Sequence, residues 1–210
     1  MLINFDFDGV IADSFGQLLA LCIGAQKVTG LGRMPVDDDL RRLENLTFEG
    51  LADRLEIPSM MVPDFLKTVF EHQQKDQSAV HFFPGMDTLL KDLSRTSDIG
   101  IITSSSSDLV RGYLVEYGVA ESVSFLCGGE KGRSKKESIL DNMDRLSVSP
   151  QQTCMVGDAI SDIRQGKAAG VMTVAVGWGF QEVELLRREN PDYLAGSPGE
   201  LLKILKSQGY

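Results

Sequence analysis

The chain has 210 residues, of which 42% are hydrophobic, and a net charge of −9. This composition is typical of a folded protein of one or two domains, and the acidic excess argues against sequence-independent nucleic acid binding and against a polybasic membrane contact. No apolar run approaches 18 residues, and Cys22, Cys127 and Cys154 lie far apart in apolar runs. We therefore expect no membrane span, free thiols and a cytoplasmic location.

Short apolar runs alternate with amphipathic stretches along most of the chain. The apolar runs predict buried strands at residues 2–7, 98–103, 124–127, 153–156, 171–176 and 193–195. The amphipathic stretches predict helices at residues 87–94, 108–117, 135–146, 162–169, 182–188 and 199–207. Strand alternating with helix predicts an α/β fold with a doubly wound parallel sheet that is covered by helices on both sides.

One segment, residues 14–83, interrupts this alternation. Residues 14–79 carry no convincing strand and predict three or four helices, within the ranges of about 14–29, 37–55 and 63–78. We therefore expect a helical cap domain at 14–83, inserted into a core domain that is formed by residues 1–13 and 84–210. Within this cap, Arg41 and Arg42 form either a solvated helix face or a contact to a substrate carboxylate.

Acidic and hydroxyl side chains follow the predicted strands at the points where they end. Asp6 and Asp8 follow the first strand, Thr103 ends the second, and Asp158 follows the fourth, with Asp162 four residues later. Ligands of open α/β sheets bind beyond the carboxyl ends of the strands. Clustered carboxylates are costly to bury there unless a cation pairs with them, and Mg²⁺ prefers such oxygen ligands.

Four motifs resemble those of the haloacid dehalogenase-like hydrolase superfamily. Residues 6–14 (DFDGVIADS) resemble its first motif, and residues 101–103 (IIT) resemble its second. A lysine at the start of a later helix resembles the third motif, and residues 157–162 (GDAISD) resemble the fourth. The turn at residues 83–86 (FPGM) and the helical insertion are similar to the subgroup of phosphoglycolate phosphatase and β-phosphoglucomutase. The resemblance covers nearly the whole chain and implies a Rossmann-like core with an α-helical cap.

The resemblance implies a role for each acid. Asp6 is expected to be the nucleophile that forms an aspartyl-phosphate, and Asp8 the general acid and then base. Asp6, the backbone carbonyl of Asp8 and Asp158 are expected to bind Mg²⁺, with Asp162 supporting Asp158. An acid at the position of Asp8 argues against dehalogenation, because the dehalogenases of the superfamily lack it.

The second and third motifs imply a phosphate-binding group opposite these acids. Thr103 and the backbone amide of Ser104 are expected to donate hydrogen bonds to phosphoryl oxygens at a helix N-terminus. A lysine is needed to balance the negative charges of the nucleophile and the phosphate. Lys135 and Lys136 differ by about 100° around a helix, so one of them faces the site. Ser134 is the expected cap of this helix, which favours Lys135.

The expected function is that of a Mg²⁺-dependent phosphatase, a monomer or homodimer that hydrolyses a small phosphorylated metabolite. A phosphosugar mutase similar to β-phosphoglucomutase is an alternative, because it returns the phosphoryl group to the substrate with the same motifs. A phospho-accepting receiver module and a non-catalytic binding protein are further alternatives. The receiver needs only about 120 residues and carries its aspartate on a later strand, whereas this chain adds a helical insertion.

Overall fold

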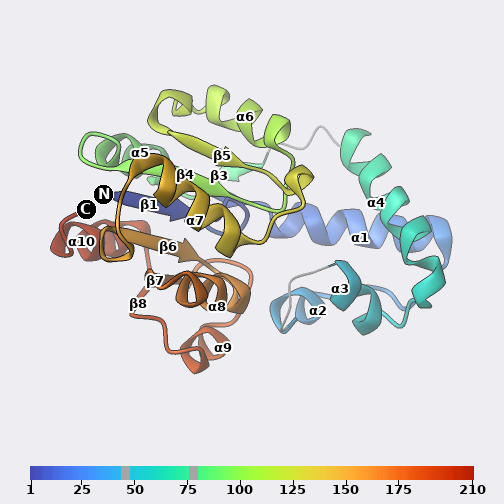
Figure 1. The fold of residues 1–210 in the computed structure, drawn as a ribbon. Helices are drawn as coiled ribbons and strands as arrows, with labels where there is room; N and C mark the ends of the chain where they lie inside the picture. The colour runs from blue at the N-terminus through green and yellow to red at the C-terminus, as the bar shows by residue number, and fades with distance from the viewer. Residues whose placement is uncertain (44–47, 76–79) are drawn as a thin grey trace.

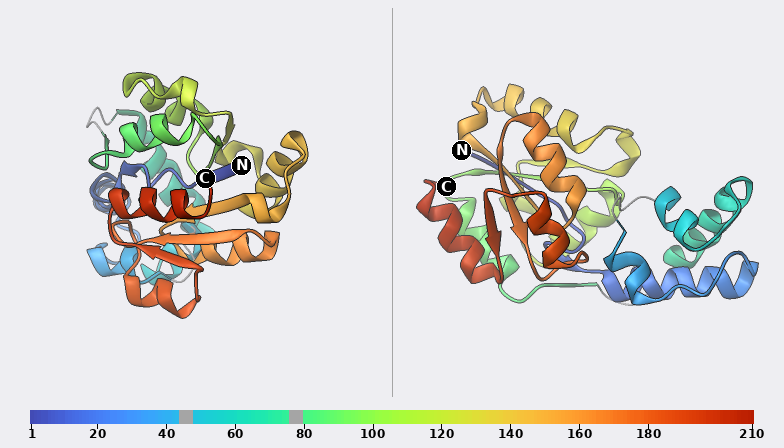
Figure 2. Two further views of the ribbon diagram at one scale, coloured as in Figure 1. Left: turned by 90° about the vertical axis from the view of Figure 1, so that its left-hand side faces the viewer. Right: turned by 90° about the horizontal axis from the view of Figure 1, so that it is seen from below.

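A computed structural model describes residues 1–43, 48–75 and 80–210. The ribbon separates into a sheet with flanking helices and a group of helices beyond one end of that sheet (Figure 1). Both termini lie together at the opposite end of the sheet, as the turned views also show (Figure 2). Within the described part of the chain, no helix is long and apolar enough to cross a membrane.

The central sheet is parallel throughout, with strand order β5-β4-β1-β6-β7-β8. Its strands are β1 (Leu2–Phe5), β4 (Asp98–Ile102), β5 (Phe125–Cys127), β6 (Thr153–Gly157), β7 (Met172–Val176) and β8 (Tyr193–Ala195). In β1, every residue is buried, because β4 and β6 pair with its two edges and helices cover both faces. This arrangement confirms the predicted doubly wound sheet.

Helices cover both faces of the sheet, each through an apolar stripe. They are α5 (Met86–Leu93), α6 (Ser107–Glu116), α7 (Lys135–Leu146), α8 (Ile160–Ala169), α9 (Val183–Arg188) and α10 (Pro198–Ser207). Leu90 of α5, Val110 of α6 and Leu201 of α10 share one apolar cluster with the sheet. Ile139 of α7 lies in a second cluster, with Leu2 and Met155 of the sheet.

The inserted segment has an apolar core of its own. It contains α1 (Phe15–Thr29), α2 (Asp37–Arg41), α3 (Phe48–Arg54), a short 3₁₀ turn (Ser59–Met61) and α4 (Val62–Lys75). Its buried side chains include Leu21, Leu55 and Phe65, and none of these belongs to the clusters under the sheet. This separation is what a subdomain with its own folding core requires.

Among the described residues, the helical range predicted at residues 37–55 contains two helices, which agrees with four helices in the segment and not with three. The helix α2 ends at Arg41, Arg42 leaves helical geometry with φ −109° and ψ 16°, and α3 begins at Phe48. The side chain of Leu43 then joins the buried cluster of the segment, and this burial outweighs the helix propensity of the stretch. The last part of the predicted helix at 63–78 lies outside the described residues, since α4 is described to Lys75.

A two-stranded antiparallel ribbon joins the inserted segment to the sheet. It pairs β2 (Ala12–Asp13) with β3 (His81–Phe82), so that Ala12 lies opposite Phe82. The amide of Phe83 also donates a hydrogen bond of 2.9 Å to the carbonyl of Ile11. The chain therefore leaves and re-enters the sheet region at one place. Two residues per strand are too few to show a periodic pattern, so this ribbon is not predictable from the sequence.

Candidate active site

Three buried aspartates meet at the carboxyl ends of the central strands. Asp6 follows β1, Asp158 follows β6, and Asp162 lies in the first turn of α8. Carboxylate oxygens from the three side chains all lie within 4.8 Å of one another. Because β1 and β6 are parallel neighbours, their ends bring Asp6 and Asp158 to the same edge of the sheet. We call these three residues the acid cluster.

Glycines allow the backbone to pack closely around Asp158. A Cβ atom on Gly9, whose φ is +75°, would lie 2.0 Å from Asp158 Oδ2, and one on Gly179 would lie 2.2 Å from Asp158 Cβ. The amide of Phe180 donates a hydrogen bond of 2.6 Å to the same Oδ2 atom. Any larger residue at Gly9 or Gly179 would displace this carboxylate.

Lys135 bridges two members of the acid cluster. Its Nζ atom lies 2.5 Å from Asp6 Oδ2 and 2.5 Å from Asp162 Oδ1. The residue before it, Ser134, caps α7 and accepts a hydrogen bond from the amide of Glu137, so Lys135 begins the helix. The neighbouring Lys136 has an exposed side chain, and its amide donates a hydrogen bond of 3.0 Å to Gln165 Oε1. The structure thus brings Lys135, and not Lys136, to the acids.

The proton affinities of this group reflect burial without enough positive charge. Burial raises the pKa of Asp6 to about 7, against the lowering effect of Lys135, and the charge of Asp162 raises it further. Burial, followed by the charges of Asp6 and Asp162, raises the pKa of Asp158 well above its usual range. Burial would lower the pKa of Lys135, but the charges of Asp162 and Asp6 raise it above its ordinary value. Lys135 therefore keeps its ammonium form at neutral pH. Its single positive charge is too little to offset the negative charges of Asp6, Asp158 and Asp162 together.

The carboxylate of Asp8 is held by hydroxyl groups. Ser14 donates to its Oδ1 atom at 2.6 Å, and Ser105 donates to its Oδ2 atom at 2.7 Å. Thr103 makes a longer contact to the same Oδ2 atom, at 3.3 Å. Ser14 is the first residue before α1, yet its hydroxyl does not cap that helix. It contacts Asp8 instead and so links the start of the inserted segment to this acid.

The sequence did not point to Ser14 or Ser105 as partners of Asp8. Ser14 is the last residue of the first motif, and Ser105 is one of four consecutive serines, with nothing in the sequence to pair either with Asp8. Within this run, Ser106 caps α6 by accepting a hydrogen bond from the amide of Leu109. Adjacent serines in a turn point in different directions, and only the three-dimensional structure assigns each hydroxyl to its partner.

A cavity opens beside Lys135, on the side of β4 and β5. It has a volume of about 250 Å³ and is lined by Thr103, Ser104, Gly128, Arg133 and Lys135 among others. Thr103 is buried, whereas Ser104 is exposed and precedes the start of α6 by three residues. Backbone amides, a hydroxyl and two cationic side chains around one cavity suit a small anion such as phosphate.

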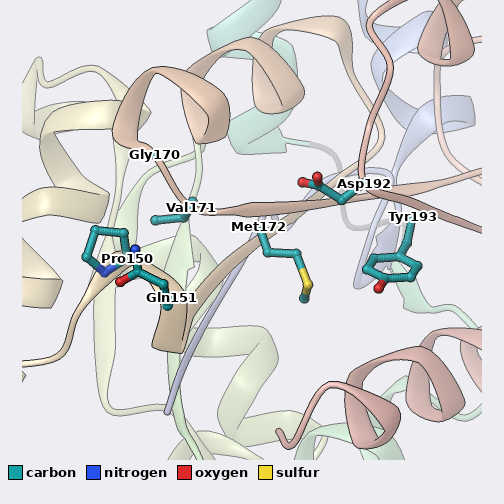
Figure 3. Close-up of a pocket in the computed structure, with 7 residues that line it drawn as sticks. All are labelled: Pro150, Gln151, Gly170, Val171, Met172, Asp192 and Tyr193. Atoms are coloured by element: carbon teal, nitrogen blue, oxygen red, sulfur yellow. The ribbon is translucent and has the colours of Figure 1, made fainter.

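A second hollow, of about 460 Å³, lies at the other end of the strands (Figure 3). It is lined by Pro150, Gln151, Gly170, Val171, Met172, Asp192 and Tyr193. The carboxylate of Asp192 is already bonded to the amide and hydroxyl of Thr173, at 2.8 and 2.9 Å. No residue of the acid cluster lines it.

Comparisons with known proteins agree with this arrangement. A family model described as haloacid dehalogenase-like hydrolase matches residues 3–176. The chain belongs to the haloacid dehalogenase-like hydrolase family.

Relatives and solved structures resemble this family member over nearly its whole length. A phosphoglycolate phosphatase of Synechococcus elongatus is 28% identical over 205 residues, which cover 97% of this chain and 96% of that protein. One from Neisseria meningitidis is 27% identical and covers 98% of this chain and 94% of its own. A haloacid dehalogenase-like family protein from Streptococcus pneumoniae superimposes with a TM-score of 0.86 at 20% identity, over 97% of both chains.

The donor set of this hydrolase fits a hard divalent cation. The acid cluster offers carboxylate oxygens only, and a single ammonium, that of Lys135, contacts it among the described residues. Three carboxylates and one ammonium leave an excess of negative charge in a buried place, which the raised pKa values of Asp6 and Asp158 express. Oxygen-rich, negatively charged sites of this kind suit Mg²⁺.

The two arginines that the sequence singled out in the inserted segment have different surroundings. The guanidinium of Arg41 lies 4.1 Å from the centre of the Phe15 ring. Arg42 pairs with Glu182 at 3.0 Å and with Asp38 at 3.8 Å. Arg42 is therefore engaged with the sheet domain rather than fully solvated.

Proposed function

We propose that this hydrolase is a Mg²⁺-dependent phosphatase that acts on a small phosphorylated metabolite through an aspartyl-phosphate on Asp6. The observation that carries the proposal is the contact of Lys135 with Asp6 and Asp162 beside an anion-sized cavity. The family membership and the relatives named phosphoglycolate phosphatase support the same reading. Phosphoglycolate, a small dianionic ester with a carboxylate, is the first substrate to test.

The proposed chemistry has two steps. A carboxylate oxygen of Asp6 attacks phosphorus, the bond to the leaving oxygen breaks, and Asp8 gives that oxygen its proton. A water molecule then attacks the same phosphorus while Asp8 takes a proton from it. The bond between phosphorus and the Asp6 oxygen breaks, which regenerates the Asp6 carboxylate and frees inorganic phosphate. Hydroxyls of Ser14 and Ser105 hold Asp8 in one orientation, so that it addresses one side of the phosphoryl group.

Positive charge around the phosphoryl group comes from several places in this proposal. Lys135 screens the charge of Asp6, and Thr103 with the amide of Ser104 donates to phosphoryl oxygens. Asp6, the backbone carbonyl of Asp8 and Asp158 would hold Mg²⁺, which neutralises the repulsion between a carboxylate and a phosphate dianion.

In this proposal, Asp162 positions Lys135 and the start of α8 and does not contact the substrate. One of its oxygens accepts from Lys135, and the other accepts from the amide of Ala159 at 3.1 Å. It therefore fixes both the ammonium and the start of α8, directly after Asp158.

We further infer that residues 14–83 form a cap domain that covers the strand ends, on a core of residues 1–13 and 84–210. Support comes from the separate apolar core of the segment and from the ribbon that joins it at one place. All proposed site residues belong to one chain, which a monomer and a homodimer satisfy equally. Three buried free thiols suit a cytoplasmic protein.

The test is a phosphate-release assay on a panel of phosphorylated metabolites, with Mg²⁺ or with excess chelator. The panel includes 2-phosphoglycolate and β-glucose 1-phosphate, and the Asp6→Asn variant is the control. The proposal expects Mg²⁺-dependent phosphate release by the wild type and none by the variant. Conversion of β-glucose 1-phosphate into glucose 6-phosphate, without phosphate release, would instead identify a mutase.

A further inference from the structure

Residues 178–182, in the loop between β7 and α9, contact the acid cluster, the inserted segment and the residues that flank the joining ribbon. We call this stretch the docking loop. Its first residue, Trp178, donates a hydrogen bond of 3.1 Å from Nε1 to the carbonyl of Val10, in the turn after Asp8. The Trp178 ring also packs edge-on against Phe83, which follows the ribbon, with 6.3 Å between ring centres. The docking loop thus contacts the chain just before it enters the inserted segment, at Val10, and just after it leaves it, at Phe83.

Phe180, in the middle of the docking loop, contacts the acid cluster and the inserted segment at once. Its amide donates to Asp158 Oδ2 at 2.6 Å. Its ring packs edge-on against that of Phe15, the first residue of α1, with 5.3 Å between ring centres. A shift of α1 that moves Phe15 therefore acts on the same residue that orients Asp158.

The side chain of Gln181 bridges the two parts of the molecule directly. Its Oε1 atom accepts a hydrogen bond of 2.6 Å from the amide of Ile160, two residues after Asp158, and its Nε2 atom donates to the carbonyl of Leu43. The side chain is 3% exposed, so an unmade hydrogen bond at either end would carry a desolvation cost. Both ends of this buried amide are thus satisfied when the carbonyl of Leu43 lies within hydrogen-bond reach of Gln181.

The outer edge of this contact is closed by an ion pair. Arg42 Nε lies 3.0 Å from Glu182 Oε1, and both side chains are at least one-third exposed. Screening by solvent makes such a pair weak, so it orients the contact more than it stabilises it. The contact joins two adjacent residues on each side. Arg42 pairs with Glu182, and Leu43 pairs with Gln181, which gives the contact a defined register.

We propose that Gln181 is a positioning residue that docks the inserted segment against the acid cluster, with the Arg42–Glu182 pair fixing the register of that contact. The kinetic part of this inference rests on the proposed phosphatase function. Docking encloses a small substrate that needs contacts on all sides, whereas an activated ester such as p-nitrophenyl phosphate depends on the acid cluster and little on enclosure.

The kinetic test compares KM and kcat for 2-phosphoglycolate and p-nitrophenyl phosphate. Gln181→Met keeps the length of the side chain and removes both hydrogen bonds, and we expect KM for 2-phosphoglycolate to rise about tenfold. We expect kcat for p-nitrophenyl phosphate to stay within about threefold of wild type. Equal losses on both substrates would overturn the proposal, because they would show a general defect of the acid cluster.

A charge exchange tests the same contact without touching a buried residue. Arg42→Glu places two acids together and should raise KM for 2-phosphoglycolate, and the double variant Arg42→Glu/Glu182→Arg should restore it. Arg95→Glu, which breaks the ion pair of Arg95 with Asp92 at 3.4 Å just after α5, is the matched control for the change in net charge. No rescue by the double variant, or an equal rise in the control, would overturn the role of the pair.

Fluorescence of Trp178, the one tryptophan of the chain, gives a measurement that does not need activity. We expect acrylamide to quench it more strongly in Gln181→Met and Arg42→Glu than in wild type, and the exchanged pair to return quenching to the wild-type value. Identical quenching in all variants would overturn the docking proposal. If no substrate is turned over, the phosphatase proposal fails while this measurement still decides whether the docking loop holds the inserted segment.

Discussion

Each of the two parts of the molecule buries an aspartate, and the two acids are held in opposite ways. In the inserted segment, Asp39 is 1% exposed and accepts hydrogen bonds from two arginines and one amide. Arg33 donates to both of its oxygens, at 2.7 and 2.5 Å, Arg54 donates at 3.1 Å, and the amide of Val36 donates at 2.9 Å. The hydrogen bonds from Arg33 hold the pKa of Asp39 below its usual range.

In the sheet domain, Asp158 is equally buried, but it faces other acids. Its Oδ2 atom accepts a hydrogen bond from the amide of Phe180. Burial, together with the charges of Asp6 and Asp162, raises the pKa of Asp158. Burial of a carboxylate is therefore not by itself a sign of function. An acid that the chain supplies with its own cations contributes to structure, whereas acids gathered without enough cations mark a place for a cation from outside.

The largest expected effect is that of Asp6→Asn on turnover. The amide fills the same space but does not attack phosphorus, so phosphate release should fall by about 1,000-fold or more. The circular dichroism spectrum and the melting temperature should stay near those of wild type. Turnover within tenfold of wild type would remove Asp6 as nucleophile.

The adjacent lysines offer a matched pair for the next effect. Lys135→Met removes the ammonium that lies 2.5 Å from Asp6 and Asp162, and we expect phosphate release to fall by about 100-fold. Lys136→Met removes the same charge one residue on, from an exposed side chain, and activity should stay within about twofold. Equal losses from the two variants would contradict the assignment of Lys135.

Stability should respond with opposite signs to the removal of the two buried charges. Asp39→Asn leaves two arginines without their partner, and the free energy of unfolding should fall by about 2 kcal/mol. Asp158→Asn relieves repulsion within the acid cluster, so the metal-free protein should become more stable at pH 8, by about 1 kcal/mol. Urea unfolding in excess chelator measures both. A loss of stability in both variants would erase the distinction between the two sites.

A smaller effect is expected in the pH dependence of the metal-free protein. Asp6, with a pKa raised to about 7, and Asp158 hold protons in the folded state that the unfolded chain releases near pH 4. The unfolded state then binds fewer protons, so stability should fall as the pH rises from about 5 to 8. Urea midpoints in chelator should show this slope, and Asp158→Asn should make it shallower. A slope of the opposite sign would rule out the raised pKa values.

The strand ends could be read from the sequence because they depend on local pattern and on one topological rule. Apolar runs at successive positions give buried parallel strands, and the acids that follow them meet at one edge. The side-chain choice between Lys135 and Lys136 also followed from a local feature, the cap at Ser134. Here the local preference and the packed structure agree.

Contacts between distant segments could not be read in this way. The bond from Ser105 to Asp8 and the bridge from Gln181 to Leu43 join residues 97 and 138 positions apart. No periodicity marks such pairs, because each depends on how two folded parts meet. The break after Arg41 has the same origin, since Leu43 leaves the helical path to become buried in the core of the inserted segment.

The central claim, that the acid cluster lacks a cation which Mg²⁺ supplies, is tested most directly by calorimetric titration of the metal-free protein with Mg²⁺. Wild type and Asp39→Asn should each bind about one Mg²⁺ per chain with similar affinity, and Asp158→Asn should lose that binding. Equal Mg²⁺ binding by wild type and by Asp158→Asn would contradict the claim.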